Sequence, residues 1–194
     1  MSTATLGALL YAFFEHFLKA QKGVSAATIK SYRDGVRLFL LFVAGERQVK
    51  LSTLRLQDLT AARVRRFLAF LEQERGNQVA SRNQRLAALK TFFDFLATHA
   101  PEQFIEAEAV MAIPVKRSPP PPTLFLEREE MQTLLGGLPI TGAQALRDRA
   151  LLVFLYNTGA RAQEVADLRQ GHLELAQQRV RLHGKGNKWR LCPL

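Results

Sequence analysis

The chain has 194 residues, of which 47% are hydrophobic, so it is long enough to bury the core of one large domain or of two small ones. Its 27 Lys and Arg, most of them arginine, outnumber 17 Asp and Glu, and the formal charge of +10 favours a polyanionic partner, most commonly DNA or RNA. A basic enzyme or a ribosome-associated protein shows the same balance. The single cysteine, Cys192, excludes an internal disulfide and a cysteine-based zinc site, and no apolar run approaches the ~18–20 residues that span a bilayer.

The N-terminal segment predicts two helices. Apolar residues recur at helical spacing from Leu6 to Leu18, and the pattern ends near Lys22–Gly23. The same segment lacks the basic start and small-residue cleavage site of a signal peptide, so we expect a cytoplasmic protein. Ser25 is a candidate N-cap for a second helix that extends to about Gly45.

Two further helices follow. Thr60 is a good N-cap for a third helix, which ends at Gly76–Asn77, and Ser81 opens a fourth. Four helices joined by short loops form a compact bundle. We therefore expect a helical domain over residues 1–113.

A proline-rich segment, residues 114–123, interrupts the periodic pattern. Lys116, Arg117 and Ser118 precede four prolines, Pro119–Pro122, which exclude a helix and predict an extended, semi-rigid backbone. We interpret the segment as a basic linker between domains; a polyproline ligand for a partner domain is the alternative.

The second region, residues 124–194, combines helices with strands. Short helices are expected over about 128–135 and 144–157, followed by a turn at Thr158–Gly159 and a third helix. Alternating apolar residues then flank the glycine-rich stretch Gly184–Lys188, which predicts a β-hairpin. A region of ~70 residues that stops on a hairpin is expected to be part of a larger domain.

Three residues of this region are candidates for chemistry. Arg161 lies at a predicted helix start, just after Gly159, where free backbone amides create a natural site for an oxyanion or a phosphate. Glu164 follows one turn later on the same face and can orient a neighbouring side chain. Lys185 lies between two glycines that allow close approach of a ligand. The alternatives are a surface ion pair of Arg161 with Asp148 or Glu164, and a solvated turn lysine.

Two motifs follow one another in this region. Tyr156–Val165 contains Thr-Gly-Ala-Arg-Ala-Gln-Glu, and Gly184–Arg190 reads Gly-Lys-Gly-Asn-Lys-Trp-Arg. In this order they resemble the Thr-Gly-x-Arg-x-x-Glu motif and the Gly-Lys-Gly-x-Lys-x-Arg hairpin of the tyrosine recombinase (phage integrase) family. Ser25–Asp34 and Ser81–Phe93 are similar to the second and fourth helices of that family's core-binding domain. The resemblance covers nearly the whole chain.

The resemblance implies a mainly α fold, with a four-helix, SAM-like core-binding domain and the first part of an α+β catalytic domain that ends in a β-hairpin. It implies cleavage of double-stranded DNA through a 3′-phosphotyrosyl intermediate, without a metal or another cofactor, by a homo-oligomer assembled on the DNA. Arg161 matches the first catalytic arginine, which stabilises the pentacoordinate phosphate, and Lys185 matches the general acid toward the leaving 5′-hydroxyl. Glu164 matches the acidic residue that supports the arginine.

Part of the family pattern is missing. The family places a His-x-x-Arg motif, a further His or Trp and the nucleophilic tyrosine after the hairpin, whereas Tyr11, Tyr32 and Tyr156 all precede it. We therefore expect a truncated recombinase that binds DNA for integration or recombination without cleaving it. Two alternatives stay open: a standalone module that occupies recombination sites and inhibits intact recombinases, and a non-functional remnant.

Basic side chains in both regions are candidate DNA contacts. Three on the second helix share one face at i, i+3 and i+7, as a stripe facing a DNA groove would, although a solvated face has the same pattern. Arg82 and Arg85 lie at the start of the fourth helix, where the family contacts DNA. The alternative is an intramolecular ion pair with Glu72 or Glu74. Two further basic residues follow the hairpin turn and are expected to contact backbone phosphate or water. In chain order, these residues are Lys30, Arg33, Arg37, Arg82, Arg85, Lys188 and Arg190.

The histidines and the aromatic residues are expected to have structural roles, although these residue types often mark functional sites. The histidines lack the mutual spacing of metal ligands, so we expect structural roles for them and no metal. Trp189 and the phenylalanines are expected in the core. The four histidines are His16, His99, His172 and His183.

Overall fold

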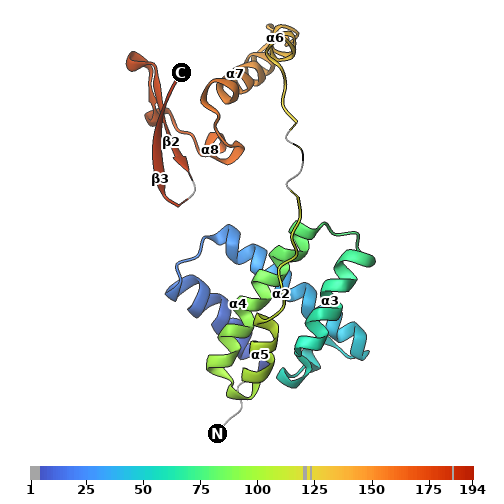
Figure 1. Ribbon diagram of the computed structural model, residues 1–194. Helices are drawn as coiled ribbons and strands as arrows, with labels where there is room; N and C mark the ends of the chain where they lie inside the picture. The colour runs from blue at the N-terminus through green and yellow to red at the C-terminus, as the bar shows by residue number, and fades with distance from the viewer. Residues whose placement is uncertain (1–4, 120–121, 123, 185) are drawn as a thin grey trace. The chain divides into compact units, whose positions relative to one another are not determined.

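The computed structural model describes residues 5–119, 122, 124–184 and 186–194. The chain divides into two units, Met1–Pro120 (unit 1) and Pro121–Leu194 (unit 2) (Figure 1). Most of the described residues lie in helices, and the only sheet among them is in unit 2, which confirms the predicted mainly α fold. None of the described helices is long and apolar enough to cross a membrane.

Unit 1 consists of helices alone in its described part (Figure 1). The first of them continues without a break into a π-helical stretch, in which the Lys22 amide donates to the Phe17 carbonyl at 2.9 Å. Three short 3-10 turns connect the longer helices. In chain order the elements are α1 (Leu6–Tyr11), η1 (Ala12–Gln21), α2 (Ala26–Arg47), η2 (Leu51–Thr53), η3 (Leu56–Asp58), α3 (Ala61–Gln73), α4 (Val79–His99), η4 (Pro101–Gln103) and α5 (Phe104–Met111).

Two of the three predicted N-caps are confirmed. The hydroxyls of Ser25 and Thr60 each accept a hydrogen bond, at 3.3 Å, from the amide three residues on, which satisfies a donor that the helix itself leaves free. The prediction for Ser81 is wrong, because α4 begins two residues earlier, after Gln78, so that Ser81 lies within the first turn.

The fifth helix, α5, was not predicted. It has only eight residues, too few to be stable in isolation, and its order comes from burying Ala107 and Val110 against the rest of unit 1. Its outward side exposes Phe104 and Ile105.

Aromatic rings fill the core of unit 1. Phe13 is fully buried and lies within 5.0–5.9 Å, between ring centroids, of four other phenylalanines, including Phe92 and Phe95. Where α2 crosses α4, a Cβ added at Gly35 would lie 3.3 Å from the Cβ of Ala88, so the glycine permits a close approach of the two helices.

The first linker residues pack against unit 1. The Asn83 side chain exchanges two hydrogen bonds with the backbone of Lys116, at 2.8 and 3.2 Å, and the Arg82 guanidinium donates to the Pro114 carbonyl at 3.1 Å. The Lys116 ammonium also pairs with Glu72 at 2.8 Å. Residues 114–116 are therefore held on α3 and α4. Two residues of the predicted proline run, Pro120 and Pro121, and the following Thr123 lie outside the described residues.

Unit 2 places its helices before a small antiparallel sheet with strand order β1-β2-β3 (Figure 1). The predicted hairpin is confirmed, with Val180 opposite Cys192 and Leu182 opposite Arg190. A third strand, β1, pairs with β2 at the edge of the sheet. It has only two residues, too few to form an alternating pattern in the sequence, and was not predicted. The elements are α6 (Arg128–Gly136), α7 (Ala143–Thr158), α8 (Ala162–Ala166), η5 (Gln170–His172), β1 (Leu173–Glu174), η6 (Leu175–Gln177), β2 (Arg179–Gly184) and β3 (Lys188–Pro193).

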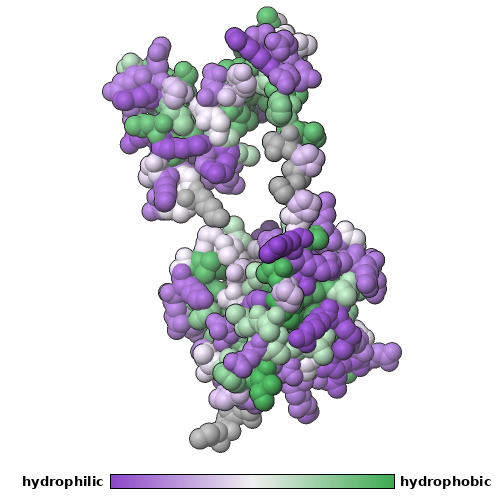
Figure 2. All heavy atoms as spheres, in the orientation of Figure 1, coloured by the Kyte–Doolittle hydropathy of each residue, from purple (hydrophilic) through white to green (hydrophobic). Residues whose placement is uncertain are grey.

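The core of unit 2 is small. Its buried hydrophobic cluster consists of Val180, Leu182 and Cys192, and Figure 2 shows hydrophobic patches on the visible face of this unit. The prediction that Trp189 is a core residue is wrong: it is 53% exposed, because its side chain leaves the sheet on the face opposite this cluster. Phe125 is exposed as well.

Candidate functional site

The turn between α7 and α8 positions Arg161. Gly159 ends α7 in the left-handed conformation, at a φ of 57°. The Thr158 hydroxyl stabilises the turn, because it donates to the Phe154 carbonyl at 2.6 Å and accepts from the Ala160 amide at 3.3 Å. Arg161 is then the N-cap residue of α8, and its side chain is 71% exposed.

A single buried carboxylate holds this turn. Glu164, whose side chain is only 4% exposed, accepts from the Arg161 amide at 2.9 Å and from the Arg161 guanidinium at 3.0 Å. Of the two alternative ion pairs, the structure therefore contains the one with Glu164, whereas Asp148 pairs with Arg147.

The same carboxylate also binds the hairpin. The Arg190 guanidinium on β3 donates to Glu164 at 2.8 Å and to the Gly159 carbonyl at 3.2 Å. A Cβ added at Gly184 on β2 would lie 2.9 Å from a Glu164 oxygen, so only glycine fits there without a shift. Glu164 thus connects the Arg161 turn to both strands that flank residue 185.

These contacts lower the pKa of Glu164 below its ordinary value of 4.5. The largest cause is the hydrogen bond from the Arg161 backbone amide; the Arg161 side chain and the charges of Arg190 and Arg161 act in the same direction, while burial opposes them. Because folding lowers the pKa of Glu164, the ionised carboxylate stabilises the folded state. This stabilisation is complete above the ordinary pKa of 4.5 and is lost as the pH falls through the pKa that Glu164 has in the folded protein.

An acid transition in the hairpin is therefore expected. Trp189, the only tryptophan, neighbours Arg190 on β3, so its fluorescence reports on the Glu164–Arg190 contact. We expect the emission to change on acidification below about pH 4.5 and the transition to be missing in Glu164→Gln, which does not titrate. Identical acid titrations of the two proteins would contradict this assignment.

The hairpin turn itself lies partly outside the described residues, since Lys185 is not among them. Next to it, the His183 Nε2–H donates to the Asn187 Oδ1 at 2.7 Å, and the His183 ring stacks on Trp189 at 4.7 Å between centroids. Lys188 is exposed at the start of β3. This stack could not be predicted from the sequence, because it depends on the register that places His183 opposite Trp189. Among the described residues, no three His, Cys, Asp or Glu side chains form a group that could hold a metal ion.

In unit 1, most of the candidate DNA contacts lie on the surface. Lys30, Arg33 and Arg37 are exposed on α2, and Arg33 is also 3.9 Å from Glu15. Lys30 and Arg85, which come from α2 and α4, line one groove of about 330 Å³. The rest of its lining consists of Ala27, Ser31, Asp34, Gly35 and Gln84.

Arg82 differs from the other candidates. It is only 5% exposed, and its hydrogen bonds go to the Asn83 side chain and to the Pro114 carbonyl, while Glu72 is occupied by Lys116. Its guanidinium contacts the linker at Pro114, and it does not line the groove that contains Arg85. In this structure Arg82 holds the chain in place and offers no surface for a ligand.

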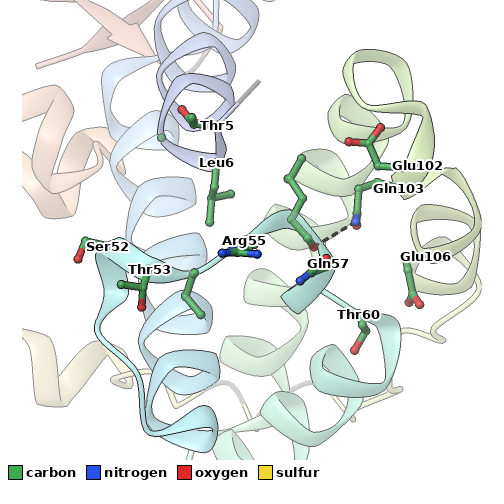
Figure 3. A pocket seen from close by; sticks show the side chains of 13 residues that line it. Thr5, Leu6, Ser52, Thr53, Arg55, Gln57, Thr60, Glu102, Gln103 and Glu106 are labelled. Carbon is green, nitrogen blue, oxygen red and sulfur yellow. Dashed lines mark hydrogen bonds between the residues drawn. The ribbon is translucent and has the colours of Figure 1, made fainter. Parts of the chain in front are cut away.

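Unit 1 also contains a cavity of about 1190 Å³ (Figure 3), which none of the candidate DNA-contacting side chains lines. Thr5, Arg55 and Glu106 are among the residues that line it, and the Gln103 side-chain amide donates to the Leu56 carbonyl at 3.0 Å. The helix cap Thr60 also lines it, but among the described residues no candidate catalytic or DNA-binding residue does.

Family models match both parts of the chain. The description "Phage integrase, N-terminal SAM-like domain" matches residues 12–99, and "Phage integrase family" matches residues 124–194. The integrase/recombinase y4rD of Sinorhizobium fredii is 36% identical over 191 residues, which cover 97% of this chain and 68% of that protein. Tyrosine recombinase XerC of Staphylococcus carnosus is 31% identical over 180 residues, covering 93% and 57% of the two chains.

The chain is also similar to a further recombinase and to one solved structure. Tyrosine recombinase XerD of Listeria monocytogenes is 30% identical over 182 residues, covering 93% of this chain and 58% of that one. The crystal structure of XerA recombinase matches at 24% identity and a TM-score of 0.40, over 97% of this chain and 59% of that one. The chain thus spans between about half and two thirds of the length of these relatives. On the strength of both family models and of the similarity to y4rD, the chain belongs to the tyrosine recombinase (phage integrase) family.

Proposed function

We propose that this chain binds double-stranded DNA at sites of integration or recombination, as part of a tyrosine-type recombinase. The observation that carries the proposal is the groove between α2 and α4, where Lys30 and Arg85 converge although they are far apart in the sequence. Arg33 and Arg37 extend the basic surface along α2. Phosphate contacts of this kind supply most of the sequence-independent affinity for DNA.

In unit 2 we assign to Arg161 the role of binding the scissile phosphate. Its guanidinium is permanently charged and exposed, while its backbone is fixed by the buried Glu164, so the cation is held in place for a ligand. Lys185 would donate a proton to the leaving 5′-hydroxyl. Arg190 supports that role by bonding β3 to Glu164, and Gly184 permits the close approach of β2 to the same carboxylate.

We also propose that the 194-residue chain binds DNA without cleaving it. Tyr11 and Tyr32 belong to unit 1, and Tyr156 lies within α7, before the Arg161 turn. None of the three matches the position of the family's nucleophile, which follows the hairpin. Incubation with duplex DNA should therefore yield no covalent protein–DNA adduct on a denaturing gel.

The DNA surface is tested by salt titration of binding to a random-sequence duplex. Because each phosphate contact releases counterions, replacing Lys30 and Arg85 together by alanine should reduce the slope of log K against log salt by roughly 2. The matched control is Lys50→Ala, since this exposed lysine follows the other end of α2, on the order of 25 Å along the helix axis.

The outcomes separate clearly. A reduced slope in the double variant, with Lys50→Ala unchanged, supports the α2–α4 surface. An equal slope in all three proteins overturns the surface assignment, and the absence of salt-dependent binding in the unchanged chain overturns the proposed function and favours a non-functional remnant.

A further inference from the structure

The groove between α2 and α4 is not uniformly basic. Besides Lys30 and Arg85, it contains the exposed carboxylate of Asp34 and the side chains of Ser31 and Gln84. A carboxylate repels phosphate, so a surface built for the DNA backbone alone gains nothing from Asp34. Base edges differ from phosphates because they present donors as well as acceptors, and carboxylate and amide oxygens bind such donors.

Gln84 is held in one orientation within this groove. Its side-chain nitrogen donates to the Ser31 hydroxyl at 2.8 Å, across the two helices, although the residue itself is exposed. One N–H and the carbonyl oxygen of the amide remain available to a ligand. The close crossing at Gly35 and Ala88, 3.3 Å for an added Cβ, keeps the two helices that carry this pair at a fixed separation.

We infer that Gln84, oriented by Ser31, reads an adenine in the major groove; this inference rests on the proposed DNA binding by the same surface. The free N–H of the amide donates to adenine N7 while its oxygen accepts from the N6 amino group, which is the bidentate pairing that glutamine forms with this base. Lys30 and Arg85 flank the pair and hold the neighbouring backbone.

The other groups of the groove are consistent with base reading. An α-helix fits the major groove, where adenine is distinguished from the other bases by its donor and acceptor pattern. Asp34, one turn along α2 from Lys30, can accept from an exocyclic amino group of an adjacent base, and it disfavours a phosphate at the same point.

The experiment is a binding selection from a random duplex library with the full chain. The unchanged protein is expected to select adenine at one fixed position. Gln84→Ala should lose preference at that position alone, by on the order of 5- to 150-fold, while its salt slope on random duplex stays the same because the change removes no charge. Ser31→Ala, which releases the amide, should weaken the same preference to a smaller extent.

Gln73→Ala is the matched control, because this glutamine is exposed near the end of α3 and does not line the groove. It should select the same sequences as the unchanged protein. Selection that is identical in Gln84→Ala overturns the inference, as does a preferred base other than adenine at the position that depends on Gln84. Salt-dependent binding without any base preference overturns the inference alone, whereas no binding to any duplex overturns the proposed function too.

Discussion

Phe13→Ala is expected to lower the free energy of unfolding of unit 1 by about 3–5 kcal/mol, the usual effect of removing a fully buried aromatic ring. The ring is inaccessible to solvent and contacts Phe92 and Phe95 of α4 as well as Phe14 and Phe17 of its own helix. Alanine would leave a cavity bordered by four rigid rings, which cannot collapse into it. Since domains are typically stable by about 5–15 kcal/mol, this is a large part of the total.

Urea unfolding followed by far-ultraviolet circular dichroism measures the effect, because unit 1 contains most of the helix. The matched control is Phe104→Ala on α5, where the side chain is 53% exposed and its truncation should change the stability by less than about 0.5 kcal/mol. Equal shifts of the midpoint in the two variants would refute the assignment of Phe13 to the centre of the core.

Glu164→Ala is expected to detach the hairpin from the Arg161 turn. The change removes the acceptor of three hydrogen bonds, from the Arg161 amide, the Arg161 side chain and Arg190, and it leaves the two guanidinium groups facing each other without a counter-charge. The buried cluster of unit 2, Val180, Leu182 and Cys192, is too small to compensate.

Hydrogen exchange measures this loss: the amides of β2 and β3 should lose protection while the helices of unit 1 keep theirs. Glu174→Ala is the matched control, since this glutamate also pairs with two arginines, Arg179 and Arg181, but at the surface, where such pairs contribute little. Glu164→Gln should lie between the two, because its amide oxygen can still accept from the Arg161 backbone. Unchanged protection in Glu164→Ala would show that the hairpin is held by other contacts.

Much of the fold follows from local signals in the sequence. The helices of unit 1 were predicted because their apolar faces repeat over several turns and because Ser25 and Thr60 cap them. The elements that were missed, α5 and β1, are too short to carry a period and are ordered by tertiary contacts. The exposure of Trp189 was missed for a related reason, since the sequence alternation does not show which face of a hairpin is covered.

The site divides in the same way. Arg161 and Glu164 are three residues apart at a helix start, so their contact could be predicted from spacing alone. The third partner, Arg190, comes from the second strand of the hairpin, β3, and the sequence indicated a phosphate contact or a solvated charge for it. The burial of Arg82 likewise depends on where the linker runs, which no local pattern encodes.

The bonds between Asn83 and Lys116 have a consequence for avidity. They assign residues 114–116 to the body of unit 1, which leaves a stretch of 11 residues in the sequence, 117–127, before α6 begins at Arg128. If both units bind one duplex, as proposed, the second binding event is intramolecular, and its effective concentration rises as this stretch shortens, provided that it can still span the sites. Asn83 would thereby tune how strongly the two units act together on DNA without contacting the DNA itself.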